Sequence, residues 1–318
     1  MGSKTNTELE PQHTSGAIDE GRARQVAERL AGPPASTRSE ATGTGALPNL
    51  VIIGAMKSAT TSLHTWLSQH PDIAMSEVKE LNFFLEGPWD RGIQWYARQF
   101  DPDAPFRGES STSYTKFPQR PGVPERMHTV IPDAKLIYIL RDPIERTVSH
   151  YFHAVQRGRE RRSLAEAVSV LEDNPYVDPS RYHSQLEQYL PHYPQTRLLI
   201  LAMEELSRQP DTVLARVLTF LGARGFTFDP RRPENEATRR GEDTAVGRVL
   251  ESYRAKRIGR HLPRTARNFA KRVNARLSRR VARPTLDPPT RLRLESYLAD
   301  DVARLRALTG EPFEGWSL

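Results

Sequence analysis

Residues 47–63, LPNLVIIGAMKSATTSL, hold a short apolar run, a glycine turn, a lysine and a cluster of hydroxyl side chains. The apolar run Leu50–Ile53 predicts a buried strand, and the sequence LHTWLSQH that starts at residue 63 predicts a helix. A helix start has unpaired N–H groups and partial positive charge, so it attracts an anion. Lys57 adds a full positive charge, and the hydroxyls add hydrogen-bond donors. This order of features predicts a phosphate-binding turn between a strand and a helix.

The turn does not match the loop of nucleoside triphosphatases, which has glycine directly before the lysine and four residues between its two glycines. Met56 precedes Lys57 in this chain, and Gly54 is the one glycine of the turn. An ordinary strand–helix turn with polar surface residues is the alternative to a phosphate site.

The turn resembles the 5'-phosphosulfate loop of the sulfotransferases, G-x-x-K-[ST]-G-T-[ST]-x-L, enzymes that use 3'-phosphoadenosine 5'-phosphosulfate (PAPS). The resemblance implies that the 5'-phosphosulfate is held by Lys57, Ser58, Ala59, Thr60, Thr61 and Ser62. It also makes Lys57 a catalytic residue, which neutralises charge on the leaving phosphate oxygen. Ala59 stands where the family usually has glycine, and a positive φ costs more for alanine than for glycine.

Residues 135–151, KLIYILRDPIERTVSHY, contain the second strong pattern. Lys135–Leu140 predicts a buried strand, and Asp142 and Pro143 suit the cap and the first turn of a helix that follows it. We expect Arg141 at the carboxyl end of this strand, which is where open α/β sheets bind their ligands.

Ser149 follows Asp142 by about two helical turns. An arginine and a serine so placed can share one phosphate, because a guanidinium offers a fork of donors. The run RDPIERTVSHYF resembles the 3'-phosphate element of the sulfotransferases, R-D-P-x-x-R-x-x-S-x-[YF]. The resemblance implies that Arg141 and Ser149 bind the 3'-phosphate of the nucleotide. Arg146 is predicted to be structural, pairing within its helix or with Asp142.

Residues 79–84, KELNFF, place two charged residues before a pair of phenylalanines. A carboxylate in such a partly dry setting gains proton affinity, which suits a general base. The glycosaminoglycan sulfotransferases have a glutamate followed by x-x-Phe-Phe at the equivalent place, and that glutamate is their base. Glu80 is therefore the candidate base of this chain. In the alternative reading, Lys79 and Glu80 are solvated loop charges.

Four further positions are candidates for contacts with cofactor or acceptor: Glu109, Tyr182, Arg239 and Arg240. Glu109, in the run RGESSTSY, is an acceptor ligand, a second acid–base group or a buried structural acid. Some family members carry a lysine after this glutamate that takes part in the acceptor site, but Ser110 replaces it, so that role is not transferred. Tyr182, in a stretch with helical spacing, either packs in the core or approaches the nucleotide or acceptor.

Residues 235–240 weakly resemble the family's loop that closes over the nucleotide. Arg239 or Arg240 would then touch the 3'-phosphate, and a solvated loop is the equal alternative. Segment 254–283 contains twelve Lys or Arg residues and no Asp or Glu. Its helical spacing predicts a basic amphipathic segment that acts as a lid or contacts an acidic acceptor, an anionic membrane surface or nucleic acid. No nucleic-acid fold motif accompanies it, so nucleic acid is the least expected partner.

Composition sets the remaining limits. The chain has 318 residues, a formal net charge of +7 and no cysteine, which excludes disulfides, zinc–thiolate sites and cysteine nucleophiles. Residues 1–46 are rich in Gly, Ser, Thr, Pro and charge, which predicts a disordered tail or, alternatively, an adaptor for a partner. The chain shows no signal-peptide pattern and no run of 18 apolar residues, so we expect a cytoplasmic protein, peripheral at a membrane if the basic segment binds one.

The sequence thus predicts one P-loop-like α/β domain over residues 47–318, with a central parallel sheet and helices on both faces. The resemblance implies a PAPS-dependent sulfotransferase that needs no metal and that sulfonates a hydroxyl or amine of a glycan, lipid or small molecule. A phosphotransferase using ATP is disfavoured, because it would need glycine before the lysine and acidic magnesium ligands. The non-enzymatic alternative is a nucleotide-binding module that binds an anionic membrane or nucleic acid through segment 254–283.

Overall fold

The computed structural model describes residues 45–229 and 282–318. The predicted tail lies outside these ranges except for its last two residues. So do Arg239 and Arg240 and all of the basic segment except residues 282 and 283. The predictions for these parts of the chain therefore stay predictions.

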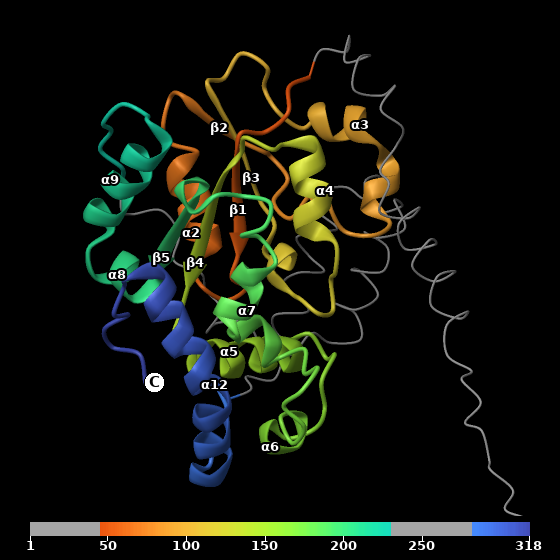
Figure 1. Cartoon of the computed structure of the whole chain (residues 1–318), viewed down its shortest axis with the longest axis vertical. Coiled ribbons are helices and arrows are strands. Elements are labelled where there is room, and N and C mark those ends of the chain that lie inside the picture. Colours follow the sequence, from red (N-terminus) through yellow and green to blue (C-terminus); the bar gives the residue numbers. More distant parts are fainter. Residues whose placement is uncertain (1–44, 230–281) are drawn as a thin grey trace, which may run out of the picture. The chain divides into compact units, whose positions relative to one another are not determined.

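The described residues form a sheet of five strands in the order β2-β3-β1-β4-β5 (Figure 1). Every neighbouring pair is parallel. The strands are β1 (Leu50–Gly54), β2 (Ile73–Met75), β3 (Phe106–Ser110), β4 (Lys135–Leu140) and β5 (Leu198–Ala202). The central parallel sheet predicted from the sequence is confirmed. Because β1 is central and the chain passes to one side of it and then to the other, the carboxyl ends of β1, β3 and β4 meet at a topological switch point.

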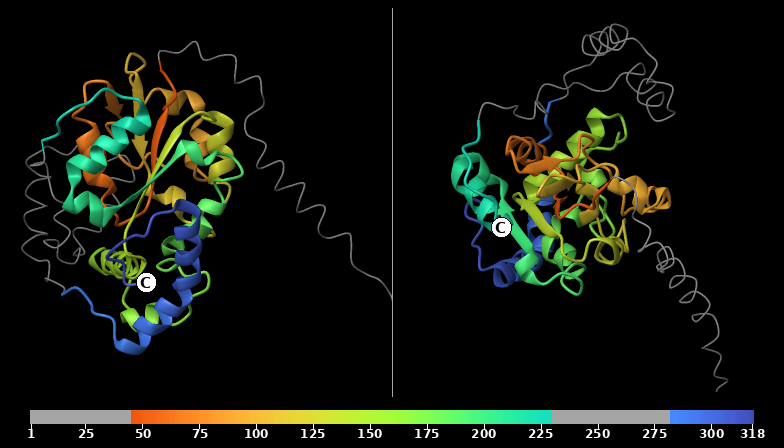
Figure 2. Two further views of the ribbon diagram at one scale, coloured as in Figure 1. Left: turned by 60° about the vertical axis from the view of Figure 1, so that its left-hand side comes forward. Right: turned by 90° about the horizontal axis from the view of Figure 1, so that it is seen from above.

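Helices cover both faces of the sheet (Figures 1 and 2). The helices are α2 (Thr60–Leu67), α3 (Ile93–Ala97), α4 (Val123–Val130), α5 (Pro143–Gln156), α6 (Leu164–Ala167), α7 (Tyr182–Glu187), α8 (Met203–Arg208), α9 (Pro210–Leu221) and α12 (Pro288–Thr309). Helices α2, α8 and α9 pack on one face, and α3, α4, α7 and α12 pack on the other. Among the described residues, no helix has the length and apolar character needed to span a membrane.

The core explains why the strands read as continuous apolar runs. On β1, Val51 and Ile53 point to the face covered by α3 and α4, while Leu50 and Ile52 point to the face covered by α2 and α9. All four side chains are fully buried. A parallel strand covered on both faces has no side that faces solvent, so its apolar residues do not alternate with polar ones. After Lys135 at its start, β4 is apolar and buried throughout, as β1 is.

Local signals fix where the helices begin and end. Asp142 caps α5, since its Oδ1 accepts the N–H of Glu145 at 2.8 Å, and Pro143 follows in the first turn. Gly222 ends α9 in the left-handed conformation, with φ of 74°, which glycine adopts without steric cost. These signals place the RDP segment directly at the end of β4.

Candidate active site

The turn between β1 and α2 lies at the carboxyl end of the central strand. Ala59 is the N-cap of α2 with φ of 60°, it makes no side-chain cap, and the first turn holds no acidic residue. The Ser58 side chain is fully buried, and its hydroxyl oxygen has no hydrogen-bond partner within the described parts of the chain. Buried hydroxyls are normally paired, so this one suits a ligand oxygen. The loop therefore fits a phosphosulfate group bound at a helix start.

The second motif meets the first in space. Arg141 Nη1 lies 3.5 Å from the carbonyl oxygen of Lys57. Arg141 Nη2 lies 3.5 Å from Glu145 Oε2, and the same carboxylate oxygen pairs with Arg283. Ser149 lies on α5, about two turns beyond the cap. The structure thus brings the turn that holds Lys57 and the RDP motif together at one edge of the sheet.

Two buried side chains support this motif from within. Tyr182 is fully buried, and its hydroxyl donates to the carbonyl oxygen of Arg141 at 2.7 Å, so it supports the arginine rather than lining an open site. Arg146 is also fully buried, but the predicted pairing within its helix or with Asp142 is wrong. Its guanidinium donates to Ser180 Oγ at 2.5 Å and to the carbonyl oxygen of Tyr176. The reason is that both carboxylate oxygens of Asp142 already accept hydrogen bonds, one from the main-chain N–H of Glu145 and one from that of Ser317.

Glu80 lies near the start of α2, in the segment between β2 and β3. Lys79 Nζ lies 2.9 Å from Glu80 Oε1 and 3.4 Å from Thr60 Oγ1, so one ammonium joins the carboxylate to the first residue of α2. Thr112 donates its main-chain N–H to Glu80 Oε2 at 3.0 Å and its hydroxyl to Oε1 at 3.1 Å. The side chain of Glu80 is 35% exposed, and its φ is 63°. A held, partly open carboxylate in an unusual backbone conformation is typical of a functional position.

Glu109 is a buried residue of β3 that lies near Glu80. It is fully buried and accepts hydrogen bonds from Tyr96 (2.6 Å), Tyr114 (2.9 Å) and Ser111 (2.9 Å). Burial raises the pKa of Glu109 to about 7, although these three donors act in the opposite direction. The Ser111 hydroxyl also accepts the N–H of Asn82, two residues after Glu80. Of the three roles predicted for Glu109, its geometry fits the buried structural acid, since no part of its side chain is accessible to an acceptor.

Two residues of this region, Lys116 and His150, were not predicted from the sequence. Lys116 lies just after the 3-10 turn Thr112–Thr115, and burial and the charge of Arg146 lower its pKa to about 8, while the nearby Glu80 carboxylate raises it. His150, the neighbour of Ser149, has its pKa lowered well below the usual range by burial and by surrounding cations that include Lys116 and Lys57. The sequence did contain signals for both residues. Lys116 follows soon after the carboxyl end of β3, and His150 lies inside the helix that follows the RDP motif.

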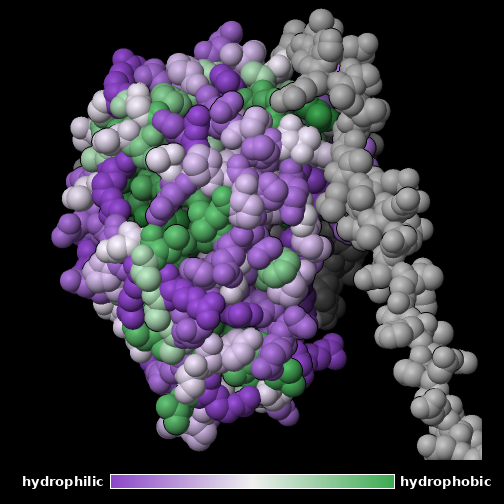
Figure 3. Space-filling view, viewed as in Figure 1, coloured by the Kyte–Doolittle hydropathy of each residue, from purple (hydrophilic) through white to green (hydrophobic). Residues whose placement is uncertain are grey.

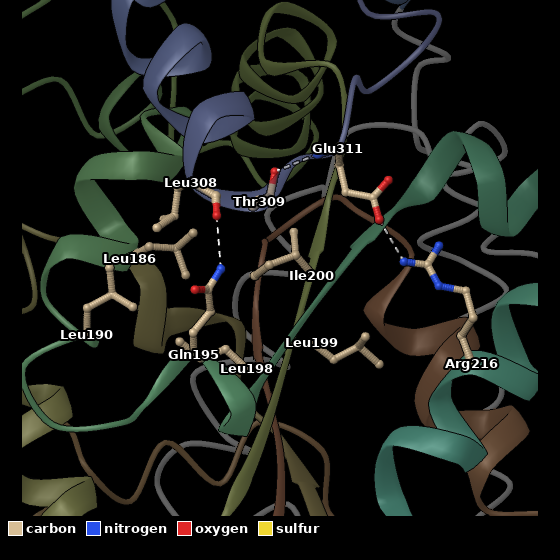
Figure 4. Close-up of a pocket in the computed structure, with 10 residues that line it drawn as sticks. All are labelled: Leu186, Leu190, Gln195, Leu198, Leu199, Ile200, Arg216, Leu308, Thr309 and Glu311. Carbon is tan, nitrogen blue, oxygen red and sulfur yellow. Dashed lines mark hydrogen bonds and ion pairs between the residues drawn. The ribbon is translucent and has the colours of Figure 1, made fainter.

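A hollow elsewhere in the fold is apolar. It lies where β5, α7 and the end of α12 meet, and its lining includes Leu186, Leu198, Ile200 and Leu308 (Figure 4). The ion pair between Arg216 and Glu311 forms part of its rim. Apolar side chains also gather on the face of the molecule drawn in Figure 3. No residue predicted for the site lines this hollow, and within the described residues no group of His, Asp and Glu could hold a metal ion.

Comparison with known proteins decides the family. Residues 47–227, more than half of the chain, match the model of the sulfotransferase domain. The chain belongs to the sulfotransferase domain family. This membership confirms the predicted enzyme class, a PAPS-dependent sulfotransferase with PAPS as co-substrate, and the predicted P-loop-like α/β fold.

Individual relatives agree with this assignment. The chain is 28% identical over 303 residues to human bifunctional heparan sulfate N-deacetylase/N-sulfotransferase 3, covering 85% of the chain but 31% of that protein. It is 37% identical over 122 residues to the membrane-associated sulfotransferase kil1 of Dictyostelium discoideum, covering 37% of the chain and 25% of that protein. The chain therefore spans about a third or less of the length of these curated relatives. A solved sulfotransferase from Alicyclobacillus acidocaldarius superposes with a TM-score of 0.63 at 26% identity, covering 86% of the chain and all of that structure.

Proposed function

We propose that this sulfotransferase transfers the sulfonate group of PAPS to an amine or hydroxyl of an acidic glycan, with Glu80 as general base. The observation that carries the proposal is the bridge made by Lys79, which contacts both Glu80 and Thr60. The bridge sets the carboxylate next to the loop that holds the phosphosulfate. PAPS supplies the sulfonate group when bound, and the nucleotide leaves as adenosine 3',5'-bisphosphate.

Each residue has a defined task in this scheme. Glu80 accepts the proton of the acceptor N–H or O–H, as its partly exposed carboxylate allows. Lys57 neutralises the phosphate oxygen that takes the electron pair of the broken sulfur–oxygen bond. Ser58, Thr60, Thr61 and Ser62, with the amides at the start of α2, hold the phosphosulfate, and Ala59 lets the main chain approach it. Arg141 and Ser149 bind the 3'-phosphate.

An acidic acceptor is supported by the cations around Glu80. Lys116 lies within electrostatic reach of Glu80, and Arg120 and Arg159 lie within reach of Lys116. A carboxylate or sulfate beside the reacting amine or hydroxyl would be attracted to this group of cations. The N-sulfotransferase named among the relatives acts on heparan sulfate. Lipids and small molecules are the other acceptor classes, and an acceptor panel must include both.

Calorimetric titration tests the nucleotide site first. Adenosine 3',5'-bisphosphate should bind tightly without metal and far more tightly than ADP or ATP. Absence of any preference for the 3'-phosphate would mean that Arg141 and Ser149 do not bind a phosphate, and the non-enzymatic binding module would then become the better account. Its basic segment, 254–283, lies almost wholly outside the described residues, so that alternative stays a prediction.

The acceptor is tested by release of adenosine 3',5'-bisphosphate from PAPS. The panel is an amine-bearing acidic glycan, its N-acetylated form, a neutral amino sugar, a phenol and a hydroxylated lipid. We expect turnover with the acidic glycans and a higher acceptor KM in Lys116→Gln, with an unchanged KM for PAPS. Turnover confined to neutral acceptors, or an unchanged acceptor KM in this variant, would contradict the assignment of an acidic acceptor.

A further inference from the structure

The carboxylate of Glu204 joins two parts of the chain that are far apart in sequence. The main-chain N–H of Asp142 donates to Glu204 Oε1 at 3.0 Å, and the indole N–H of Trp316 donates to Oε2 at 3.1 Å. The main-chain N–H of Ser317 donates to Asp142 Oδ2 at 2.5 Å. These three hydrogen bonds close a ring through Asp142, Glu204 and the neighbours Trp316 and Ser317.

The ring adjoins the main chain of Arg141. The hydroxyl of Tyr182 donates to the Arg141 carbonyl oxygen at 2.7 Å, and the ring centroids of Tyr182 and Trp316 lie 5.7 Å apart. The remaining oxygen of Asp142 caps α5. The main chain that carries Arg141 is therefore held by α8 through Glu204, by α7 through Tyr182, and by the segment after α12 through Trp316 and Ser317.

Burial makes the ring restrictive. Asp142 is 5% exposed and Trp316 is 8% exposed, and Phe313 stacks on Trp316 with ring centroids 4.4 Å apart. Glu204 is half-buried and Ser317 is exposed, so the restriction comes from the two buried members. A shift of Asp142 or of the Trp316 indole leaves a buried donor or acceptor unpaired. The ring therefore fixes the direction in which the chain leaves β4, and that direction sets where the Arg141 side chain begins.

We propose that Trp316 and Glu204 are positioning residues that hold Arg141 in the orientation required by a nucleotide 3'-phosphate. The inference rests on the function proposed above, in which Arg141 binds that phosphate. Trp316 and Glu204 act through the main chain of Asp142 and Arg141 rather than by touching the nucleotide. Their loss should therefore weaken binding of nucleotides that carry a 3'-phosphate and leave binding of other nucleotides unchanged.

Two conservative substitutions test the ring in the full chain. Trp316→Phe removes the indole N–H but keeps an aromatic ring against Phe313 and Tyr182. Glu204→Gln keeps the shape, but an amide has one acceptor oxygen where the ring needs two, so one donor loses its partner. Glu311→Gln is the matched control, because it removes the ion pair of Glu311 with Arg216 in the same C-terminal segment (Figure 4). Arg216 keeps its ion pair with Glu205, and Glu311 takes part in none of the three hydrogen bonds of the ring.

The measurement is the affinity of each variant for adenosine 3',5'-bisphosphate and for ADP, by calorimetry, with thermal unfolding of each protein alongside. We expect the two ring variants to bind the bisphosphate about tenfold more weakly, the size of one lost buried hydrogen bond to a charged group, with unchanged affinity for ADP. The control should match the wild type for both nucleotides.

Two results would overturn the inference: bisphosphate affinity that stays native in both ring variants, or equal losses for both nucleotides, which would show a purely structural role. Failure of the proposed function looks different, because wild-type protein would then show no preference for the bisphosphate over ADP.

Discussion

A guanidinium nitrogen of Arg141 lies 3.5 Å from the main-chain carbonyl oxygen of Lys57, although 84 positions separate the two residues in sequence. The contact joins the end of β4 to the loop after β1, and these strands are neighbours in the sheet. The two segments proposed to bind the two ends of the nucleotide thus have a fixed spacing. An adenosine that carries phosphate at both its 3' and 5' positions can meet both segments at once, which ADP cannot do.

Replacing Lys57 with alanine should remove charge neutralisation at the leaving oxygen. We expect kcat to fall about a hundred- to a thousandfold, as for the loss of one electrostatic contact to a transition state. The fold should survive, because Lys57 lies in a loop and outside the hydrophobic core. Single-turnover assays and thermal unfolding measure the two effects. Arg208→Ala, at an exposed position on α8, is the control, and a native rate in Lys57→Ala would show that the assignment of Lys57 is wrong.

Replacing Glu80 with glutamine should remove the general base with little change in shape. The expected loss in kcat is about a hundred- to ten-thousandfold, while affinity for adenosine 3',5'-bisphosphate stays native, since the nucleotide loop is intact. Glu77→Gln, at an exposed position of the same loop, is the matched control. A kcat of Glu80→Gln within about twofold of the wild-type value would be too small a change for the loss of a general base. It would show that another group takes the acceptor proton.

The sequence predicted well those parts of the site that are built from local signals. The strand β1, the turn after it, the cap Asp142 and the helix α5 all follow from short-range rules, because each depends on neighbouring residues. Parallel strands also bring their carboxyl ends to one edge, so two separate motifs could be expected to meet.

The partners of buried polar side chains could not be predicted in this way. Arg146 contacts Ser180 and Tyr176 rather than Asp142, because Asp142 is used by Glu145 and by Ser317, which lies 175 positions away. No local pattern encodes such a pairing. Lys116 was missed for the same reason, since its proximity to Glu80 arises where the chain turns after β3.

Ala59 offers a test of the loop's backbone. Its φ of 60° lies in the left-handed region. This agrees with the glycine that the sulfotransferase motif usually has at this position, since glycine adopts a positive φ most easily. An alanine there costs about 1 kcal/mol relative to glycine, so Ala59→Gly should raise the free energy of unfolding by up to about that amount. Denaturant unfolding measures it. Ala154→Gly, inside α5, is the control and should lower stability by about 1 kcal/mol. A loss of stability in Ala59→Gly would contradict the left-handed assignment.

Glu109 predicts a pH dependence of stability. Burial raises its pKa from 4.5 to about 7, so between these values the unfolded chain releases the proton while the folded chain keeps it. The folded state then binds more protons, and the Glu109 contribution to stability is lost as pH rises, at about 1.4 kcal/mol per pH unit at most. Below pH 4.5 both states are protonated, and above pH 7 the loss is complete.

The variant Glu109→Gln isolates this effect. Its stability relative to the wild type should increase as pH rises from 4.5 to 7, because an amide does not ionise. The comparison must be a difference, since His64 acts in the opposite sense over much of the same range: burial and the charge of Lys79 lower its pKa to about 4, so it contributes stability that grows with pH. Denaturant unfolding at several pH values provides the data, with Glu77→Gln as the exposed control. A difference between Glu109→Gln and wild type that does not vary with pH would mean that Glu109 ionises in the folded protein as readily as in the unfolded chain.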